Sequence, residues 1–239
     1  MALLSFDGWL FLLRWIHFLS GVVWIGLLYY FNFVQTPFFA ETEPAVRSGA
    51  IQKLVPRALW WFRWGAMVTF FSGWLILLHR MSQLGGFRNF MQTSYGWAIV
   101  LGGVLGSFMW ANVWFVIWPK QKIVIANAVG TAAGKPANPA AAAAGQRAGF
   151  ASRTNVVFSI PMLFYMGAAS HLPGLAGTFT RGGKIGMALV SAAIILLIEE
   201  NALFGTAGPT KKPLGTIKGT LWAGFILAAI FSLLFEVFF

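Results

Sequence analysis

Six apolar stretches, each long enough to cross a bilayer, constrain this chain more than any other feature. They lie at approximately residues 8–34, 58–79, 94–118, 155–171, 185–204 and 217–239. A helix needs about 20 predominantly apolar residues to span the hydrocarbon core. Because backbone groups in lipid must be hydrogen-bonded within their own segment, such stretches predict transmembrane helices. We therefore predict an all-α, polytopic membrane helical bundle of about six transmembrane helices in a single domain, surrounded by membrane lipid.

Composition agrees with a membrane protein and excludes several kinds of site. The chain is 58% hydrophobic and 10% charged, with a mean hydropathy of +0.73. The net charge of +11 does not indicate a nucleic-acid partner, because the basic residues lie mostly between the spans, where they set topology. The sequence has no cysteine, which excludes disulfides, iron–sulfur clusters and the C-x-x-C-H attachment of c-type haem.

The basic residues are unequally divided between the two sides of the predicted membrane. The N-terminal side carries Arg80, Arg88, Arg181 and Lys184. The opposite side carries Arg47, Lys53, Arg57, Lys120, Lys122, Lys135, Arg147, Arg153, Lys211, Lys212 and Lys218. Cytoplasmic loops carry the excess of Lys and Arg. This predicts that both termini face outward and that the Ala-rich segment 120–153 is a cytoplasmic loop of low complexity, with a short helix over residues 140–148.

One face of the first span carries residues that apolar helices seldom contain. At ~100° per residue, Arg14 and His17 share this face with Gly21, Trp24 and Gln35. Ionisable groups inside a membrane usually face a protein interior or a bound group. This face is therefore predicted to form a wall of a buried cofactor site, in which Gly21 leaves room beside the imidazole. The alternative is that His17 hydrogen-bonds to a neighbouring helix and binds no cofactor.

The three histidines of the chain, His17, His79 and His171, all fall in the outer half of the predicted bundle. Imidazoles from different helices are a common way to hold haem b. We predict His17 and His171 as the ligands of a haem iron, with His79 as the alternative second ligand. Arg14 would meet a propionate, because its guanidinium can donate two bonds to a carboxylate. The predicted cofactor-binding set is His17, His171, His79, Arg14, Gly21, Trp24 and Gly167; catalytic residues are not indicated.

Two segments resemble a known family. WIHFLSGVVWIGLLYYFNFVQTPFF in the first span and ASRTNVVFSIPMLFYMGAASH in the fourth are similar to the membrane domain of bacterial membrane-bound urate hydroxylases, the urate oxidase N-terminal domain family. The resemblance implies oxidation of urate to 5-hydroxyisourate in the bacterial inner membrane. It also implies electron transfer to a C-terminal cytochrome c domain outside the cytoplasm. This chain has no C-x-x-C-H, so the expected redox partner is a separate protein.

Three functions are alternatives at this point. The first is a haem b-binding membrane protein that exchanges electrons with a periplasmic cytochrome c or another redox subunit, as part of a respiratory-type complex. The second is a urate hydroxylase that uses a separate cytochrome c, with a basic pocket on the outer side among Arg14, Arg80, Arg88 and Arg181. The third is a cofactor-free structural or assembly subunit. The sequence alone leaves open whether the chain is a urate-oxidising oxidoreductase.

Overall fold

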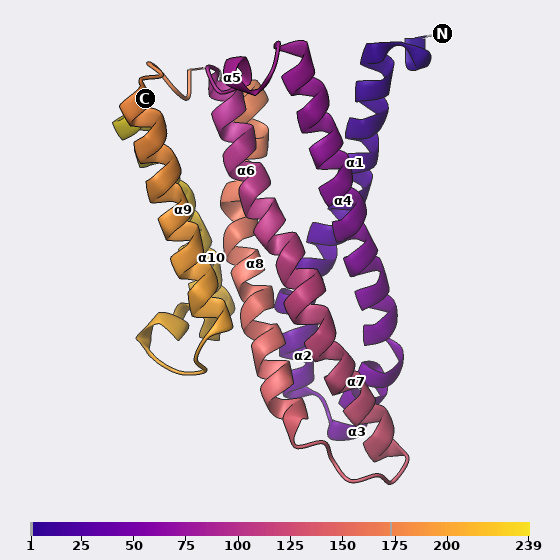
Figure 1. Cartoon of the computed structure of the whole chain (residues 1–239). Helices are drawn as coiled ribbons and strands as arrows, with labels where there is room; N and C mark the ends of the chain where they lie inside the picture. The colour runs from indigo at the N-terminus through magenta and orange to yellow at the C-terminus, as the bar shows by residue number, and fades with distance from the viewer. Residues whose placement is uncertain (1, 173) are drawn as a thin grey trace.

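A computed structural model describes residues 2–172 and 174–239, and this part of the chain is helical without strands (Figure 1). In chain order the α-helices are α1 (Phe6–Tyr29), α2 (Thr36–Glu41), α3 (Pro44–Lys53), α4 (Val55–Gln83), α5 (Phe87–Phe90), α6 (Ser94–Ala111), α7 (Trp118–Ala132), α8 (Ala140–His171), α9 (Arg181–Leu203) and α10 (Ile217–Phe238). A first π turn (Tyr30–Gln35) joins α1 to α2, and a second (Asn112–Ile117) joins α6 to α7. Short 3-10 turns occupy Ala2–Leu4, Pro209–Lys211 and Pro213–Gly215.

The predicted all-α membrane architecture is confirmed. Five helices in the described residues are long and apolar enough to cross a membrane, namely Phe6–Glu41, Val55–Gln83, Ser94–Ala132, Arg181–Leu203 and Ile217–Phe238. The remaining predicted span, 155–171, is the second half of α8, which is not among them. This helix packs against α6, α7, α9 and α10, so much of its surface faces protein, while Leu163, Phe164 and Gly167 near its end are exposed. A helix enclosed in this way can carry polar residues that a lipid-facing helix cannot.

The helices cross the bundle in alternating directions. In Figure 1 both termini lie at the same end, and the turn between α7 and α8 lies at the other, which we call the hairpin end. The α1–α4 pair stands on one side of the central helices α6 and α8, and α9 with α10 stands on the other (Figure 1). Successive long helices therefore run in opposite directions, as a bundle that crosses a membrane six times requires.

Small residues let α1 and α4 approach closely. A Cβ placed on Gly65 would lie 3.2 Å from the backbone nitrogen of Trp24. One placed on Gly73 would lie 3.0 Å from Cε1 of His17. Both are tighter than ordinary contacts, so only glycine fits without a shift of the neighbour. Close packing through small residues is the usual basis of helix association in membranes.

The expectation that residues 120–153 form mainly a loop is wrong, whereas the short helix expected at residues 140–148 is present as the start of α8. Most of this segment is helical, in α7 and the first half of α8, and the connection covers only residues 133–139. Alanine is the strongest helix former, and here Ala128, Ala144 and Ala148 are also buried in the α7–α8 contact. Low complexity therefore reflects a tightly packed helical hairpin rather than a flexible connector.

Two of the continuous helices are longer than a membrane is thick. Phe6–Glu41 has 36 residues and Ser94–Ala132 has 39. At ~1.5 Å per residue both exceed 50 Å, against a hydrocarbon core of ~30 Å. Their far ends, with α3, lie at the hairpin end (Figure 1). The shorter helices α9 and α10, of 23 and 22 residues, turn before they reach this end (Figure 1), so the excess length of the two long helices lies at the hairpin end, beyond the hydrocarbon core. Helix α3, which has no buried residue, lies on its surface.

Candidate functional site

A cavity of about 480 Å³ lies at the hairpin end. Its walls come from the first π turn, α2, α3, α4, the end of the second π turn, α7 and α8. The four arginines suggested for a pocket on the outer side, Arg14, Arg80, Arg88 and Arg181, are not among its lining residues, and that outer pocket stays a prediction. The volume is typical of sites for small molecules, which range from about 300 to 1,000 Å³.

The first π turn positions the polar wall of this cavity. The amide nitrogen of Thr36 bonds to the carbonyl of Phe31, five residues earlier, and the Thr36 hydroxyl donates to the same oxygen at 2.7 Å. A π turn accommodates one extra residue and is frequent at functional sites. Asn32 is buried here and donates to the Ser152 hydroxyl of α8 at 2.8 Å and to the Leu28 carbonyl at 2.8 Å. The turn is thereby fixed against the central helix.

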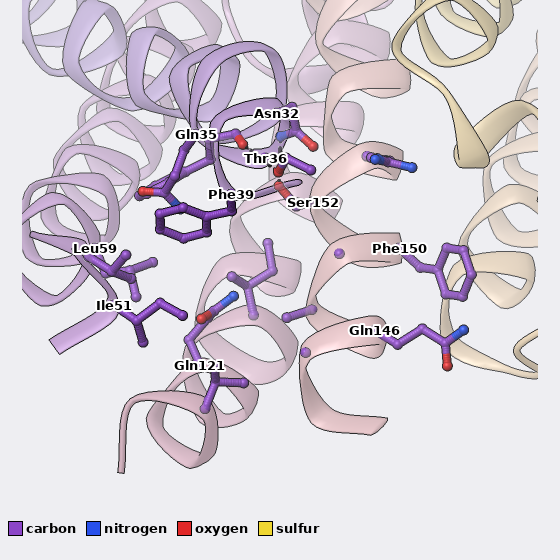
Figure 2. Close-up of a pocket in the computed structure, with 18 of the residues that line it drawn as sticks. Asn32, Gln35, Thr36, Phe39, Ile51, Leu59, Gln121, Gln146, Phe150 and Ser152 are labelled. Carbon is purple, nitrogen blue, oxygen red and sulfur yellow. Dashed lines mark hydrogen bonds between the residues drawn. The ribbon is translucent and has the colours of Figure 1, made fainter. Parts of the chain in front are cut away.

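Amide groups and one aromatic ring converge inside the cavity. In Figure 2, Gln35 and Phe39 approach from the first long helix, and Gln121 approaches from α7 on the opposite side. The Oε1 atom of Gln35 is buried and has no hydrogen-bond partner among the described residues. A buried unpaired acceptor costs about 1–3 kcal/mol. The cavity therefore presents an acceptor that a ligand N–H group would satisfy.

Other side chains on the α8 wall point elsewhere. Gln146 and Phe150 are directed away from the cavity, toward the segment that connects α9 to α10 (Figure 2). There the buried Lys211 ammonium lies 4.9 Å from the centre of the Phe150 ring. Burial lowers the pKa of Lys211 from its usual range, and the positive charge of Arg147 lowers it further. Arg153 likewise donates to the Leu214 carbonyl, so these cations tie the α9–α10 connection to α8.

The contacts of His17 match the alternative to a haem ligand. Its Nδ1 atom lies 3.1 Å from the Ser72 hydroxyl of α4, within hydrogen-bond distance. Its ring also packs against Gly73 of the same helix. The hydrogen bond to a neighbouring helix that the sequence left open is therefore present. Gly21, which was expected to clear space for a porphyrin, instead faces the Thr69 methyl group at an ordinary contact distance of 3.9 Å for an added Cβ.

The other two histidines have separate partners. The His79 ring stacks on Phe6 with 3.7 Å between ring centres. His171 is exposed at the end of α8, and its Nδ1 atom lies 2.9 Å from the Gly167 carbonyl of its own helix. None of these contacts joins two histidines, and the described residues contain no group of three or more His, Cys, Asp or Glu placed to hold a metal ion. No described contact brings His17 together with His171 or His79, and the haem ligand pair stays a prediction.

The remaining residues of the predicted set are also dispersed. Trp24 is 2% exposed and packs into the α1–α4 contact, with its indole N–H unpaired among the described residues. Arg14 is partly buried on α1, and Gly167 is exposed on α8 with open space beside it. Neither makes a described interaction with His17 or Ser72. The structure does not gather these residues into one site.

A buried polar network that we did not predict links three helices. Asn112, the first residue of the second π turn, donates to Asn155 Oδ1 of α8 and to Glu199 Oε2 of α9, each at 3.0 Å. Asn155 donates in turn to the Met109 carbonyl at 2.9 Å. All three side chains are buried. In the sequence, these amide and carboxyl groups stand out because they lie inside three apolar stretches. Their spacing along the chain, however, does not show that they contact one another.

A family of known proteins matches part of the chain. Residues 87–200 match the family described as urate oxidase N-terminal. The family resemblance is confirmed over this region. Neither a curated protein nor a solved structure matches the chain. The urate oxidase N-terminal match runs from α5 to near the end of α9, so it includes Gln121 and the Asn112–Asn155–Glu199 network, while Gln35 and Phe39 lie outside it.

Proposed function

We propose that this multi-pass membrane protein is a urate hydroxylase-like oxidoreductase that binds urate, or a closely related oxopurine anion, in the amide-lined cavity. The unpaired acceptor of Gln35, opposite Gln121, is the observation that carries the proposal. Urate is planar and displays ring N–H donors and carbonyl acceptors around its edge. Carboxamides offer both a donor and an acceptor, and an aromatic ring such as that of Phe39 favours a flat ligand.

The proposed reaction requires water as the oxygen source and a partner that accepts two electrons. Conversion of uric acid to 5-hydroxyisourate adds the oxygen of one water at C5 and releases two protons and two electrons. The electrons would pass to a periplasmic cytochrome c or another redox subunit. With the basic hairpin end in the cytoplasm and both termini in the periplasm of a bacterial inner membrane, the electrons would have to cross the bundle.

Aromatic contacts between α4 and the α6–α7 helix support such a crossing. Ring centres are 5.7 Å apart for Trp64 and Trp114, 4.2 Å for Phe70 and Trp110, and 6.2 Å for Phe70 and Trp74. Along α4 these positions advance from the cavity end toward the end that carries the termini. These ring contacts shorten the gaps between side chains that an electron crossing this part of the bundle would have to pass.

Haem b remains a prediction, and the histidine contacts do not support the proposed ligand pair. If haem b is bound through His17, the purified protein will show a visible haem spectrum that His17→Ala abolishes or converts to high spin. Ser72→Ala is the matched control, because it removes the hydrogen-bond partner and leaves the imidazole. Unchanged haem content and spectrum in His17→Ala would exclude this ligand, and a colourless wild-type protein would favour cofactor-free alternatives.

Titration of the purified, detergent-solubilised protein with urate tests the binding proposal. We expect calorimetry to show saturable binding with one site per chain. Allantoin should bind much more weakly, because it carries ureido N–H and carbonyl groups but lacks the flat bicyclic ring that would stack on Phe39. Equal affinity for urate and allantoin, or no binding of urate, would contradict the proposal.

A further inference from the structure

A second hollow of about 300 Å³ adjoins the amide-lined cavity. The two share Phe39, Ala40, Arg47 and Ile51 as lining residues. Because both are bounded by the same four residues of α2 and α3, they form adjoining chambers. We call the second one the outer hollow.

The outer hollow leads toward water rather than toward lipid. Its further walls are the start of α3 and the last turns of α7, contributed by Thr42, Pro44, Ser48, Asn127, Ala128 and Thr131. Most of these side chains are polar, and Thr131 is exposed. Both segments lie at the hairpin end, which extends beyond the hydrocarbon core (Figure 1). A hydrophilic ligand could therefore reach this hollow without entering the bilayer.

Arg47 has a distinctive place between the two chambers. Arg47 lines both chambers, and the other lining residues of the outer hollow are uncharged. No interaction with another described side chain neutralises it. Glu41 and Glu43 lie nearby in sequence, at the end of α2 and just before α3, but neither lines either chamber. An anion passing from the outer hollow to the cavity would thus meet an unpaired guanidinium.

We infer that ligands reach the amide-lined cavity from the aqueous phase at the hairpin end, between α3 and α7, and that Arg47 at the junction favours anionic ligands. The identity of the anion as urate rests on the proposed function, whereas the route rests on the geometry alone. Under the predicted orientation the ligand comes from the cytoplasm. An exposed cation at the mouth of a cleft acts chiefly on the association rate, and salt weakens its effect.

Single cysteines test the route cleanly, because the natural sequence has none. Thr131→Cys places a thiol in the outer hollow, and Thr178→Cys places one on the exposed connection at the opposite end, between α8 and α9. A membrane-impermeant maleimide is applied to right-side-out and to inverted vesicles. We expect the two thiols to react in opposite vesicle orientations, with saturating urate slowing only the reaction at Thr131→Cys.

Two results would overturn the route. One is labelling of both thiols from the same side, which needs no ligand and so stands apart from the proposed function. The other is urate that binds, as shown by calorimetry, without protecting Thr131→Cys. Should urate fail to bind at all, the proposed function falls, while the sidedness of labelling still decides where the hollow opens.

The role of Arg47 is tested by association kinetics at low and high salt. We expect Arg47→Gln to slow urate association by about threefold to tenfold at low salt, and the difference to shrink at high salt. Arg47→Lys should retain most of the rate. Lys53→Gln is the matched control, because Lys53 is a cation on the same helix that lines neither chamber. Equal slowing by Arg47→Gln and Lys53→Gln would show a general charge effect and contradict a specific role.

Discussion

Replacement of Gln35 by leucine is expected to weaken urate binding about tenfold or more. Leucine is similar in size but removes the buried acceptor that lacks a partner among the described residues. A ligand N–H group left buried without its acceptor costs about 1–3 kcal/mol, and 1.4 kcal/mol corresponds to a factor of ten in affinity. Gln121→Leu should have a similar effect from the opposite wall. Calorimetric titration of each variant measures the change.

The cavity supplies its own control for this experiment. Gln146 is also a glutamine on the cavity wall, but its side chain points away toward the α9–α10 connection (Figure 2). Gln146→Leu should therefore leave urate affinity within about twofold of the natural protein. If Gln35→Leu binds urate as tightly as the natural protein, or if Gln146→Leu loses as much affinity, the ligand does not contact the wall as proposed.

The helical membrane class could be predicted from the sequence because it depends on the length of apolar stretches alone. Helix ends were less predictable. The first and third spans were expected to end near residues 34 and 118, yet both helices continue past Pro37 and Pro119. Each proline lies two residues after the end of a π turn, and local π geometry accommodates the hydrogen bonding that a proline disrupts.

The same π turns explain why the candidate site could not be placed. At ~100° per residue, Gln35 falls on the face of His17 and Arg14. The extra residue accommodated by the first π turn rotates the remainder of the helix by roughly 100°, so this shared face is not maintained beyond Tyr30. The histidines were predicted as haem ligands because of the chemistry of their side chains. However, whether two of them meet depends on how the helices cross, and the sequence does not specify this.

The second large effect is expected from Asn112→Leu, which should destabilise the bundle by about 2 kcal/mol or more. The variant loses two hydrogen bonds, to Asn155 and to Glu199, and leaves two buried acceptors without their donor. Uncompensated burial of each polar group costs about 1–3 kcal/mol. Because the network joins the second π turn to α8 and α9, the loss should appear as a lower midpoint of thermal unfolding in detergent.

Two further variants separate this network from general effects of a substitution in α6 or the second π turn. Ser107→Ala removes a hydroxyl that donates only to the Gly103 carbonyl of its own helix at 2.7 Å, so its effect should stay within about 0.5 kcal/mol.

In the double variant Asn112→Leu/Glu199→Leu, donor and carboxyl are both replaced by apolar groups. Removing both partners is commonly less costly than removing one. We therefore expect the double variant to be more stable than the sum of the single variants predicts; strict additivity would show that Asn112 and Glu199 do not interact.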